Sequence, residues 1–231
     1  MPSIYEDGTY LANNPTWHQE MSPWVAGQAL RMIRRNGLRP ATVCEVGCGA
    51  GEVLRQMSLQ MGPGVRFLGY EISPQAFEIC RPKAGGNLEF CLGDFLEQES
   101  PRFDLLLAFD VIEHVEDIYG FLRRLKPRAE NKMFHIPLEL SAQSVARETP
   151  LLRMREKVGH LHVFTRRTAL AAIEHAGFEV LDSFYTRWAV ETTGWGLPNA
   201  LLRLPRRVLS RICPHLAARL LGGFSLMVLA R

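Results

Sequence analysis

Short β-rich runs alternate with segments of helical spacing along most of the chain. The first pair is a run at residues 42–46 and a helical segment at 52–60, and the last apolar run is at 224–230. A helix that crosses over between two strands of one sheet leaves those strands parallel. The alternation therefore predicts an α/β fold with a parallel, doubly wound sheet. We expect strands at 42–46, 65–70, 88–92, 103–109, 132–136, 178–185 and 224–230, and helices at 24–35, 52–60, 74–80, 118–125 and 167–176.

The charge of the chain is divided unevenly. The formal net charge is only +3, but residues 192–231 contain six arginines and no Asp or Glu. Removing those arginines leaves 21 basic against 24 acidic residues in the rest of the chain. We expect no nucleic-acid partner for such a mildly acidic body, because coating nucleic acid needs a strongly basic domain. The basic end leaves room for a local anionic partner.

The cysteines and the first residues favour a reducing compartment. The chain has five cysteines, an odd number, and no C-x-x-C pair. Its start lacks the basic residues and apolar core of a secretory signal. The longest apolar stretch, Leu220–Ala230, is too short for a bilayer-spanning helix, which needs about 20 residues. We therefore expect free thiols and a cytoplasmic protein.

A glycine-rich loop follows the first predicted strand. It contains Gly47, Gly49 and Gly51, with Glu45 just before it, and such glycines let a ligand approach the backbone. An ordinary strand-to-helix turn would also explain the loop taken alone. A dinucleotide fingerprint needs glycine where this chain has Glu52, whose charge would repel a pyrophosphate at the helix N-terminus. NAD and FAD are therefore disfavoured, and a nicotinamide oxidoreductase is the weaker rival hypothesis.

Two further carboxylates follow the next two predicted strands. Glu71 ends the second strand, and Asp94 follows the third with Phe95 beside it. A carboxylate after the second strand can accept hydrogen bonds from both hydroxyls of a ribose. Asp94 can accept from an adenine amino group while Phe95 lies against the ring. Acidic groups after three successive strands, with glycines after the first, predict a nucleoside-type ligand.

These segments resemble the successive motifs of class I S-adenosylmethionine-dependent methyltransferases, from about residue 39 to residue 185. The resemblance implies a Rossmann-like, seven-stranded, mostly parallel sheet with helices on both faces and an antiparallel last strand. It also implies S-adenosylmethionine as methyl donor. By the same resemblance, Glu45, Gly47, Cys48, Gly49 and Gly51 face the methionine part, Glu71 and Ile72 the ribose and adenine, Asp94 and Phe95 the adenine, and Phe109 and Asp110 the sulfonium.

A cluster of acid–base residues follows the fourth predicted strand. This strand leads into Asp110, Glu113 and His114, and His160 lies downstream in a Gly-His-x-x-x-Phe-Thr run. Because imidazole titrates near neutral pH, His114 is the candidate general base. The predicted catalytic set is His114, Glu113 and His160. The alternative is that Glu113 and His114 only brace the following loop.

The same cluster also suggests a metal hypothesis. The Glu113-His114 pair is similar to that of ubiquinone-pathway O-methyltransferases. With Asp110 and His160 it also resembles plant small-RNA 2′-O-methyltransferases, in which such residues hold a divalent metal. Here position 110 is the shorter Asp, and the additional RNA-binding domains of those enzymes are missing. We therefore do not favour a metal, although carboxylates and imidazoles suit Mg²⁺ or a transition metal.

Extensions lie at both ends of the predicted domain. The resemblance implies that residues 1–38 form an N-terminal helical lid over the donor, with Tyr10 facing it, and that 39–231 form the methyltransferase domain. The alternative is that the aromatic residues of this segment only pack a terminal helix on the body. A basic helical insert is expected at about 194–222.

The insert combines an apolar stripe with arginines, and Pro205 should limit a long continuous helix. We expect the stripe to pack on the sheet and the arginines to face solvent. The alternatives are a membrane-surface helix near a lipid-linked substrate, an acceptor lid or a homodimer contact. The stripe is Leu201, Leu204, Val208 and Ile212, and the arginines are Arg203, Arg206, Arg207 and Arg211.

The predicted activity is methyl transfer to an oxygen of a small-molecule biosynthetic intermediate, a sugar or another hydroxyl acceptor. No residue separates oxygen from nitrogen acceptors, so an N-methyltransferase is the close alternative. A donor-binding protein without turnover is the alternative from a different class. The acidic and imidazole residues after the fourth strand favour catalysis over that alternative.

Overall fold

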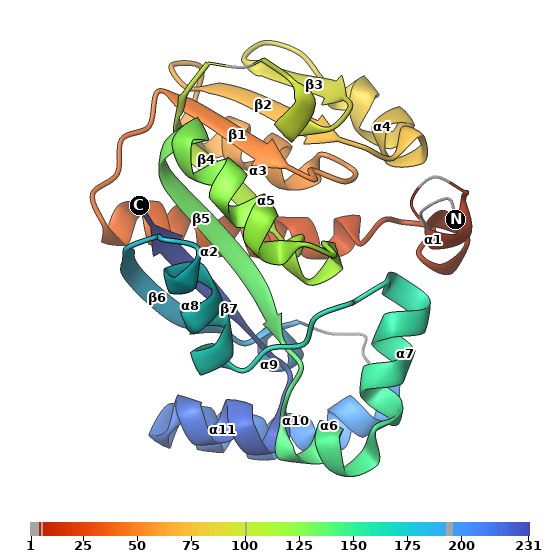
Figure 1. Ribbon diagram of the computed structural model, residues 1–231. Helices are drawn as coiled ribbons and strands as arrows, with labels where there is room; N and C mark the ends of the chain where they lie inside the picture. Colours follow the sequence, from red (N-terminus) through yellow and green to blue (C-terminus); the bar gives the residue numbers. More distant parts are fainter. Residues whose placement is uncertain (1–4, 6, 100, 193–195) are drawn as a thin grey trace.

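The computed structural model describes residues 5, 7–99, 101–192 and 196–231, and these form one seven-stranded sheet flanked by helices (Figure 1). The strand order is β3-β2-β1-β4-β5-β7-β6, and only β7 runs antiparallel to its neighbours. This confirms the predicted fold class. The strands are β1 (Thr42–Val46), β2 (Arg66–Glu71), β3 (Leu88–Leu92), β4 (Phe103–Phe109), β5 (Ala129–Leu138), β6 (Val180–Thr186) and β7 (Phe224–Ala230).

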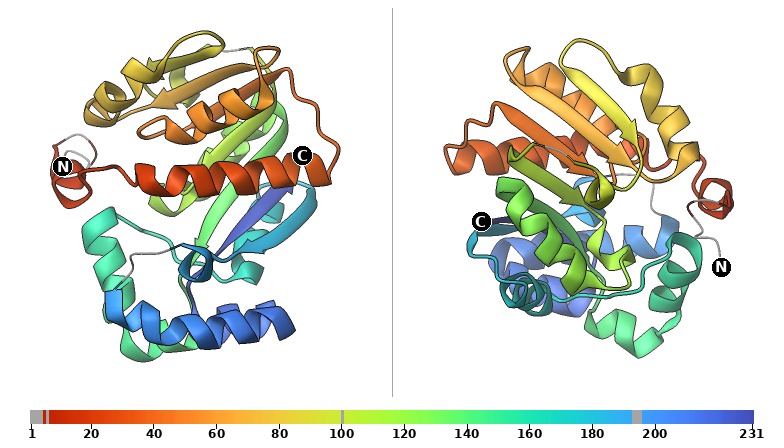
Figure 2. Two further views of the ribbon diagram at one scale, coloured as in Figure 1. Left: turned by 180° about the vertical axis from the view of Figure 1, so that it is seen from behind. Right: turned by 45° about the horizontal axis from the view of Figure 1, so that its top comes forward.

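Helices cover both faces of the sheet, as predicted (Figure 2). All five expected helices are present, with bounds that differ by at most two residues from the expected ones. The helices are α1 (Thr9–Asn13), α2 (Ser22–Arg35), α3 (Glu52–Met61), α4 (Pro74–Cys80), α5 (Ile118–Leu125), α6 (Ala142–Arg147), α7 (Thr149–Val158), α8 (Arg166–His175), α9 (Trp188–Glu191), α10 (Gly196–Ile212) and α11 (Pro214–Leu221).

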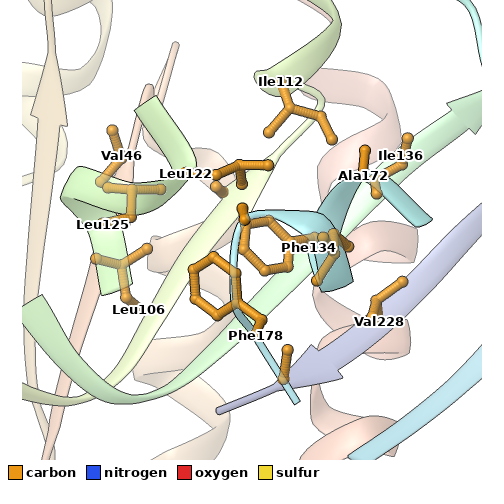
Figure 3. Packing of buried hydrophobic residues seen from close by; sticks show 14 of the residues in the cluster. Val46, Leu106, Ile112, Leu122, Leu125, Phe134, Ile136, Ala172, Phe178 and Val228 are labelled. Atoms are coloured by element: carbon orange, nitrogen blue, oxygen red, sulfur yellow. The ribbon is translucent and has the colours of Figure 1, made fainter. Parts of the chain in front are cut away.

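Two hydrophobic layers hold the sheet between its helices. Successive residues of a strand point to opposite faces, so Leu106 of β4 packs with α5 and α8, while Leu105 and Leu107 pack with α2 and α3. Figure 3 shows the first layer, where the rings of Phe134 and Phe178 meet edge to face with centroids 5.7 Å apart. The carboxyl ends of the parallel strands are thereby held at one edge, where a ligand site is expected.

Helix α2 belongs to the second layer. Its Ala26, Ala29 and Ile33 recur at helical spacing and are buried beside Val43 and Leu105 of the sheet. Among the described residues before Ser22, short helical turns lie outside this packing: α1 and η1 (Gln19–Met21). A cover over the site can therefore be sought only in this first part of residues 1–38.

The C-terminal insert differs from its prediction in two ways. Helix α10 continues through Pro205 instead of stopping near it. Its apolar stripe faces solvent, and Arg206 is buried in its place, with 2% of its surface exposed. The Arg206 guanidinium donates to the backbone carbonyls of Leu221 and Gly222, at 2.8 Å each, which satisfies the end of α11. Residues 194 and 195, where the insert was expected to begin, lie outside the described residues.

No helix in the described part of the chain combines the length and the hydropathy that crossing a bilayer requires.

Candidate active site

The glycine-rich loop joins β1 to α3 through a left-handed backbone conformation. Gly47, Gly49 and Gly51 have φ angles of 68°, 53° and 71°, in the left-handed region that favours glycine. The loop is fixed to β2, because the Cys48 amide donates to the Tyr70 carbonyl at 3.0 Å. The Cys48 side chain is buried, so this residue offers a ligand its backbone and not its thiol.

The carboxylate of Glu71 holds the loop from the end of β2. Its Oε2 accepts from the Gly49 amide at 2.7 Å, and its Oε1 accepts from the Ser73 amide at 2.8 Å. Burial raises the pKa of this carboxyl although both amides favour its charged form. Each carboxylate oxygen has a second lone pair, so Glu71 retains the capacity to accept from a ligand hydroxyl.

Glu45 is a buried carboxyl at the end of β1. Among the described residues its Oε2 has no hydrogen-bond partner, which is costly for a buried polar atom. Burial raises the pKa of Glu45 well above its usual value, and the negative charges of Glu71 and Asp110 raise it further. A cationic ligand beside the loop would attract the ionised carboxylate and offset the cost of burying it. Glu45 therefore fits the donor-binding role predicted for it.

After β3, the ring of Phe95 lies in the core and not at the surface where a ligand could contact it. The Asp94 side chain accepts from the Leu96 amide at 2.8 Å and so begins a short turn, η3 (Phe95–Glu97). The ring of Phe95 packs in the core against Tyr70, with centroids 5.1 Å apart, so the expected contact of this ring with an adenine is wrong. Ile72, by contrast, exposes half of its surface and can pack on a ligand ring.

Strand β4 delivers Phe109 and Asp110 to the same edge. Asp110 has a φ of 52°, an uncommon conformation for a residue with a side chain. Its Oδ1 lies 2.9 Å from Nδ1 of His135, whose Nε2 lies 3.0 Å from the Thr186 hydroxyl. Phe109 is buried, with its ring 6.2 Å from that of His135. Asp110 is thereby tied to β5 and β6 instead of to Glu113.

The structure brings Glu113, His114 and His160 together. One ligand atom from each lies within 4.8 Å of the others, and the two imidazole rings meet edge to face at 4.7 Å. Glu113 is fully buried, and neither carboxyl oxygen has a hydrogen-bond partner in the described chain. Burial raises its pKa well above the usual range, and the charge of Asp110 raises it further. His160 is held by Glu139, with Nδ1 and Oε1 2.9 Å apart.

The surroundings of His114 leave one ring nitrogen available. The Tyr5 hydroxyl donates to the Val158 carbonyl and lies 2.7 Å from Nδ1 of His114, and the Gly159 carbonyl lies 3.2 Å from the same nitrogen. Two acceptors around Nδ1 assign the proton to it, which leaves Nε2 unprotonated. Burial and the charge of His160 lower the pKa of His114 to about 4. The imidazole is therefore neutral at physiological pH.

Aromatic residues of the N-terminal segment lie over the site. The ring of Tyr10 lies 5.0 Å from that of Tyr5 and 4.6 Å from that of Trp17. Trp17 reaches the glycine loop, because a Cβ placed on Gly49 would lie 2.9 Å from its Cδ1. The segment thus connects the loop to His114 and covers both.

A large cavity opens beside these residues. Its volume is about 1050 Å³, and Asp110, Glu113 and His114 form part of its wall. The remaining wall is mainly apolar and aromatic, with three arginines and further polar residues such as Glu139 and His160. It includes Tyr10, Met21, Trp24, Leu151, Met154, Trp188, Arg147, Arg153 and Arg206.

The sequence from residue 19 to residue 183 matches the family model described as a methyltransferase domain. The chain belongs to this methyltransferase family. It is a class I S-adenosylmethionine-dependent methyltransferase with the seven-stranded sheet described above.

Curated relatives of this methyltransferase match over part of their length. The ubiquinone biosynthesis O-methyltransferase of Rhodopseudomonas palustris strain BisB18 is 35% identical over 112 residues, which cover 44% of this chain and 42% of the relative. The ajmaline N-methyltransferase of Rauvolfia serpentina is 26% identical over 133 residues, or 52% of this chain and 45% of the relative. The methyltransferase therefore matches less than half the length of these relatives.

Solved structures share the fold over nearly the whole methyltransferase. One is a chain from the complex of the Haloferax volcanii Trm112 methyltransferase activator with a methyltransferase, at a TM-score of 0.66 and 15% identity over 99% of this chain and 98% of that one. Another is the magnesium protoporphyrin IX methyltransferase of Synechocystis PCC 6803 with bound S-adenosylhomocysteine. Its TM-score is 0.59 and its sequence identity 16%, over 95% of this chain and 85% of that one. At these identities the likeness shows the fold alone.

Three residues of the methyltransferase site did not stand out in the sequence. Tyr5 and Glu139 hold the two imidazoles from segments far away in the chain, and such contacts leave no local pattern. His135 does carry a signal, because it is a titratable residue within the otherwise apolar run 133–136 of β5. A buried polar residue in such a run needs a partner, which here is Asp110.

Proposed function

We propose that this methyltransferase transfers a methyl group to a hydroxyl of a small molecule whose body is largely apolar. The proposal rests on His114, a neutral imidazole that lines a cavity of about 1050 Å³ and whose contacts at Nδ1 leave Nε2 as the proton acceptor. Apolar residues such as Trp24, Leu151 and Met154 suit an apolar body better than a free sugar. Arg147 and Arg153 suit an anionic substituent on it.

When bound, S-adenosylmethionine supplies a methyl group already activated by a positive sulfur. The protein therefore needs to orient the acceptor and to accept its proton. Glu45, the glycine loop, Glu71 and Ile72 hold the donor in this proposal, with Asp94 and the backbone of Phe95 at its adenine. The segment from Tyr5 to Met21 is the lid, which excludes water once both ligands are bound.

The proposal is tested with His114→Ala and a panel of phenolic and amine acceptors. Turnover of a phenolic acceptor should fall at least about a hundredfold, since general bases contribute roughly 10²–10⁴ in rate. Binding of S-adenosylhomocysteine should remain unchanged. The acidic limb of the wild-type rate profile should lie near pH 4, following the lowered pKa of His114. Unchanged turnover in His114→Ala would exclude the base role, and transfer to amines alone would favour N-methylation.

A metal-assisted reaction is the second candidate, because one carboxylate and two imidazoles converge. Glu113, His114 and His160 offer the mixed oxygen and nitrogen donors that several divalent ions accept. Both oxygens of Glu113 lack a hydrogen-bond partner within the described residues, and a bound cation would satisfy them. Activity that survives EDTA, together with a metal-free protein by elemental analysis, would reject this candidate. Loss of activity in EDTA, with recovery on adding Mg²⁺ or Zn²⁺, would favour the metal-assisted reaction over His114 as a simple general base.

The alternative without catalysis is a donor-binding protein. Such a protein would bind S-adenosylhomocysteine and methylate no acceptor in the panel.

We also propose a cytoplasmic location, supported by five cysteines that are all free in the structure.

A further inference from the structure

Helices α10 and α11 lie together at one end of the molecule, away from β1, β2 and β3 (Figures 1 and 2). The outer face of α10 carries large apolar side chains at spacings of three and four residues. Leu201, Leu204, Val208 and Ile212 expose 79%, 69%, 52% and 77% of their surfaces. Soluble proteins rarely leave such a continuous stripe to water without a function for it.

The orientation of α10 is fixed by its other face. Arg206 and Ser210 are buried, and Leu209 packs against the core of α11. Because Arg206 donates to carbonyls at the end of α11, turning the stripe inward would break those hydrogen bonds. The exposed stripe is therefore part of the fold.

The charges around the stripe indicate what covers it. Arg207 and Arg211 are exposed and follow the stripe along one side of the helix, and no Asp or Glu occurs between residues 192 and 231. Leu216 and Leu220 of α11 are also exposed. A second copy of this face would bring like charges together, because an isologous dimer pairs the same patch with itself. An apolar stripe flanked by arginines instead complements an anionic lipid surface.

We propose that the outer face of α10, extended by α11, docks on the surface of an anionic phospholipid bilayer. The side chains of Leu201, Leu204, Val208 and Ile212 enter the boundary between headgroups and acyl chains, and Arg207 and Arg211 contact lipid phosphates. On its inner side, α10 contributes Leu202 and Arg206 to the wall of the large cavity. Docking therefore places the acceptor cavity next to the lipid. This inference does not depend on the proposed reaction.

The test is co-sedimentation with vesicles, without donor or acceptor. The wild-type protein should bind vesicles of phosphatidylcholine mixed with phosphatidylglycerol at low salt, and less as salt increases. Binding to phosphatidylcholine alone should be weak. Leu204→Glu should lower the partition coefficient at least about tenfold, because it removes a leucine that docking would bury and adds a charge that the anionic lipid repels. Arg207→Gln with Arg211→Gln should lower it by about tenfold or more.

A matched control separates docking from a general loss of solubility or fold. Leu59 of α3 is 67% exposed, almost the same as Leu204, and lies outside the stripe. Leu59→Glu should leave vesicle binding unchanged. The proposal is overturned if the wild-type protein does not co-sediment with the anionic vesicles, or if Leu59→Glu loses as much vesicle binding as Leu204→Glu. A concentration-dependent dimer in sedimentation velocity that Leu204→Glu abolishes would assign the face to self-association instead. Donor binding, measured separately, reports on the active site in every variant.

Discussion

At the scale of single residues, Glu45 links stability to pH. Its native pKa is raised by burial and then by the charges of Glu71 and Asp110. Above the ordinary Glu pKa of about 4.3, the native state keeps a proton that the unfolded chain releases, so this residue lowers stability as pH rises. Glu45→Gln stays neutral in both states, so its unfolding free energy should exceed that of the wild type by a margin that grows between pH 5 and pH 8. Urea unfolding at each pH measures this.

The control for Glu45 is Glu174→Gln on the exposed side of α8, which should leave the pH profile unchanged. The stabilised Glu45→Gln variant should also bind S-adenosylhomocysteine about tenfold more weakly, because the carboxylate that would face the cationic end of the ligand is gone. Stabilisation without loss of binding would show that Glu45 lies outside the donor site.

The sequence predicted which residues gather at the site better than it predicted how they pair. Glu113, His114 and His160 meet as expected, since the loop after α7 returns to the end of β4. The partner of Asp110 is His135, and that of His114 is Tyr5, across 109 positions of the chain. Such partners depend on the relative placement of distant segments, which no local pattern encodes.

At the scale of elements, two glycines in different settings should respond in opposite ways to alanine. Gly51 has a φ of 71°, and a Cβ there would lie 2.6 Å from the Phe90 ring and 2.7 Å from Cys80. Gly51→Ala should cost about 2–4 kcal/mol of unfolding free energy. Gly27 lies within α2 with nothing within 4 Å of its Cβ position, so Gly27→Ala should add up to about 1 kcal/mol. Chemical unfolding of both variants measures the contrast, and equal effects would contradict it.

The N-terminal segment should act as one element over the donor site. Trp17 lies against Gly49 of the loop, and its ring is tilted by 51° to that of Tyr10. Trp17→Ala should let S-adenosylhomocysteine dissociate about tenfold faster, because the cover loses its contact with the loop. Stopped-flow displacement measures the rate. The control is Tyr119→Ala on α5, a partly exposed ring away from the loop, and an equal acceleration there would refute the lid.

Elements with clear boundary signals were predicted well, and the orientation of α10 was not. Pro74 begins α4 and a nearly uniform apolar run forms β4, both at the expected bounds. For α10, the period of the stripe correctly predicted one apolar face. The period does not say which face meets the body, and the hydrogen bonds of Arg206 to α11 reversed the expected choice. Those carbonyls lie 15 and 16 positions further along the chain.

At the scale of the whole molecule, the alternation of strands and helices predicted a doubly wound sheet but not the place of each strand. The resemblance to known methyltransferases implied an antiparallel last strand, and the structure places this strand, β7, between β5 and β6. Because β6 and β7 are antiparallel neighbours, a short hairpin could join them, and α10 and α11 are an insert in this connection that the sheet does not need. This insert carries the surface proposed to meet the membrane.

The whole fold should be stabilised by its donor-site ligand, because the predicted site joins the ends of β1, β2, β3 and β4. S-adenosylhomocysteine at about 100 times its Kd should add about 2.7 kcal/mol and raise Tm by about 5–10 °C. NAD at the same concentration should leave Tm unchanged, since Glu52 stands where a dinucleotide loop needs glycine. Leu204→Glu should keep the full shift, as its side chain points away from the cavity. Differential scanning calorimetry measures all three, and a shift with NAD in place of S-adenosylhomocysteine would contradict the assignment of the donor site.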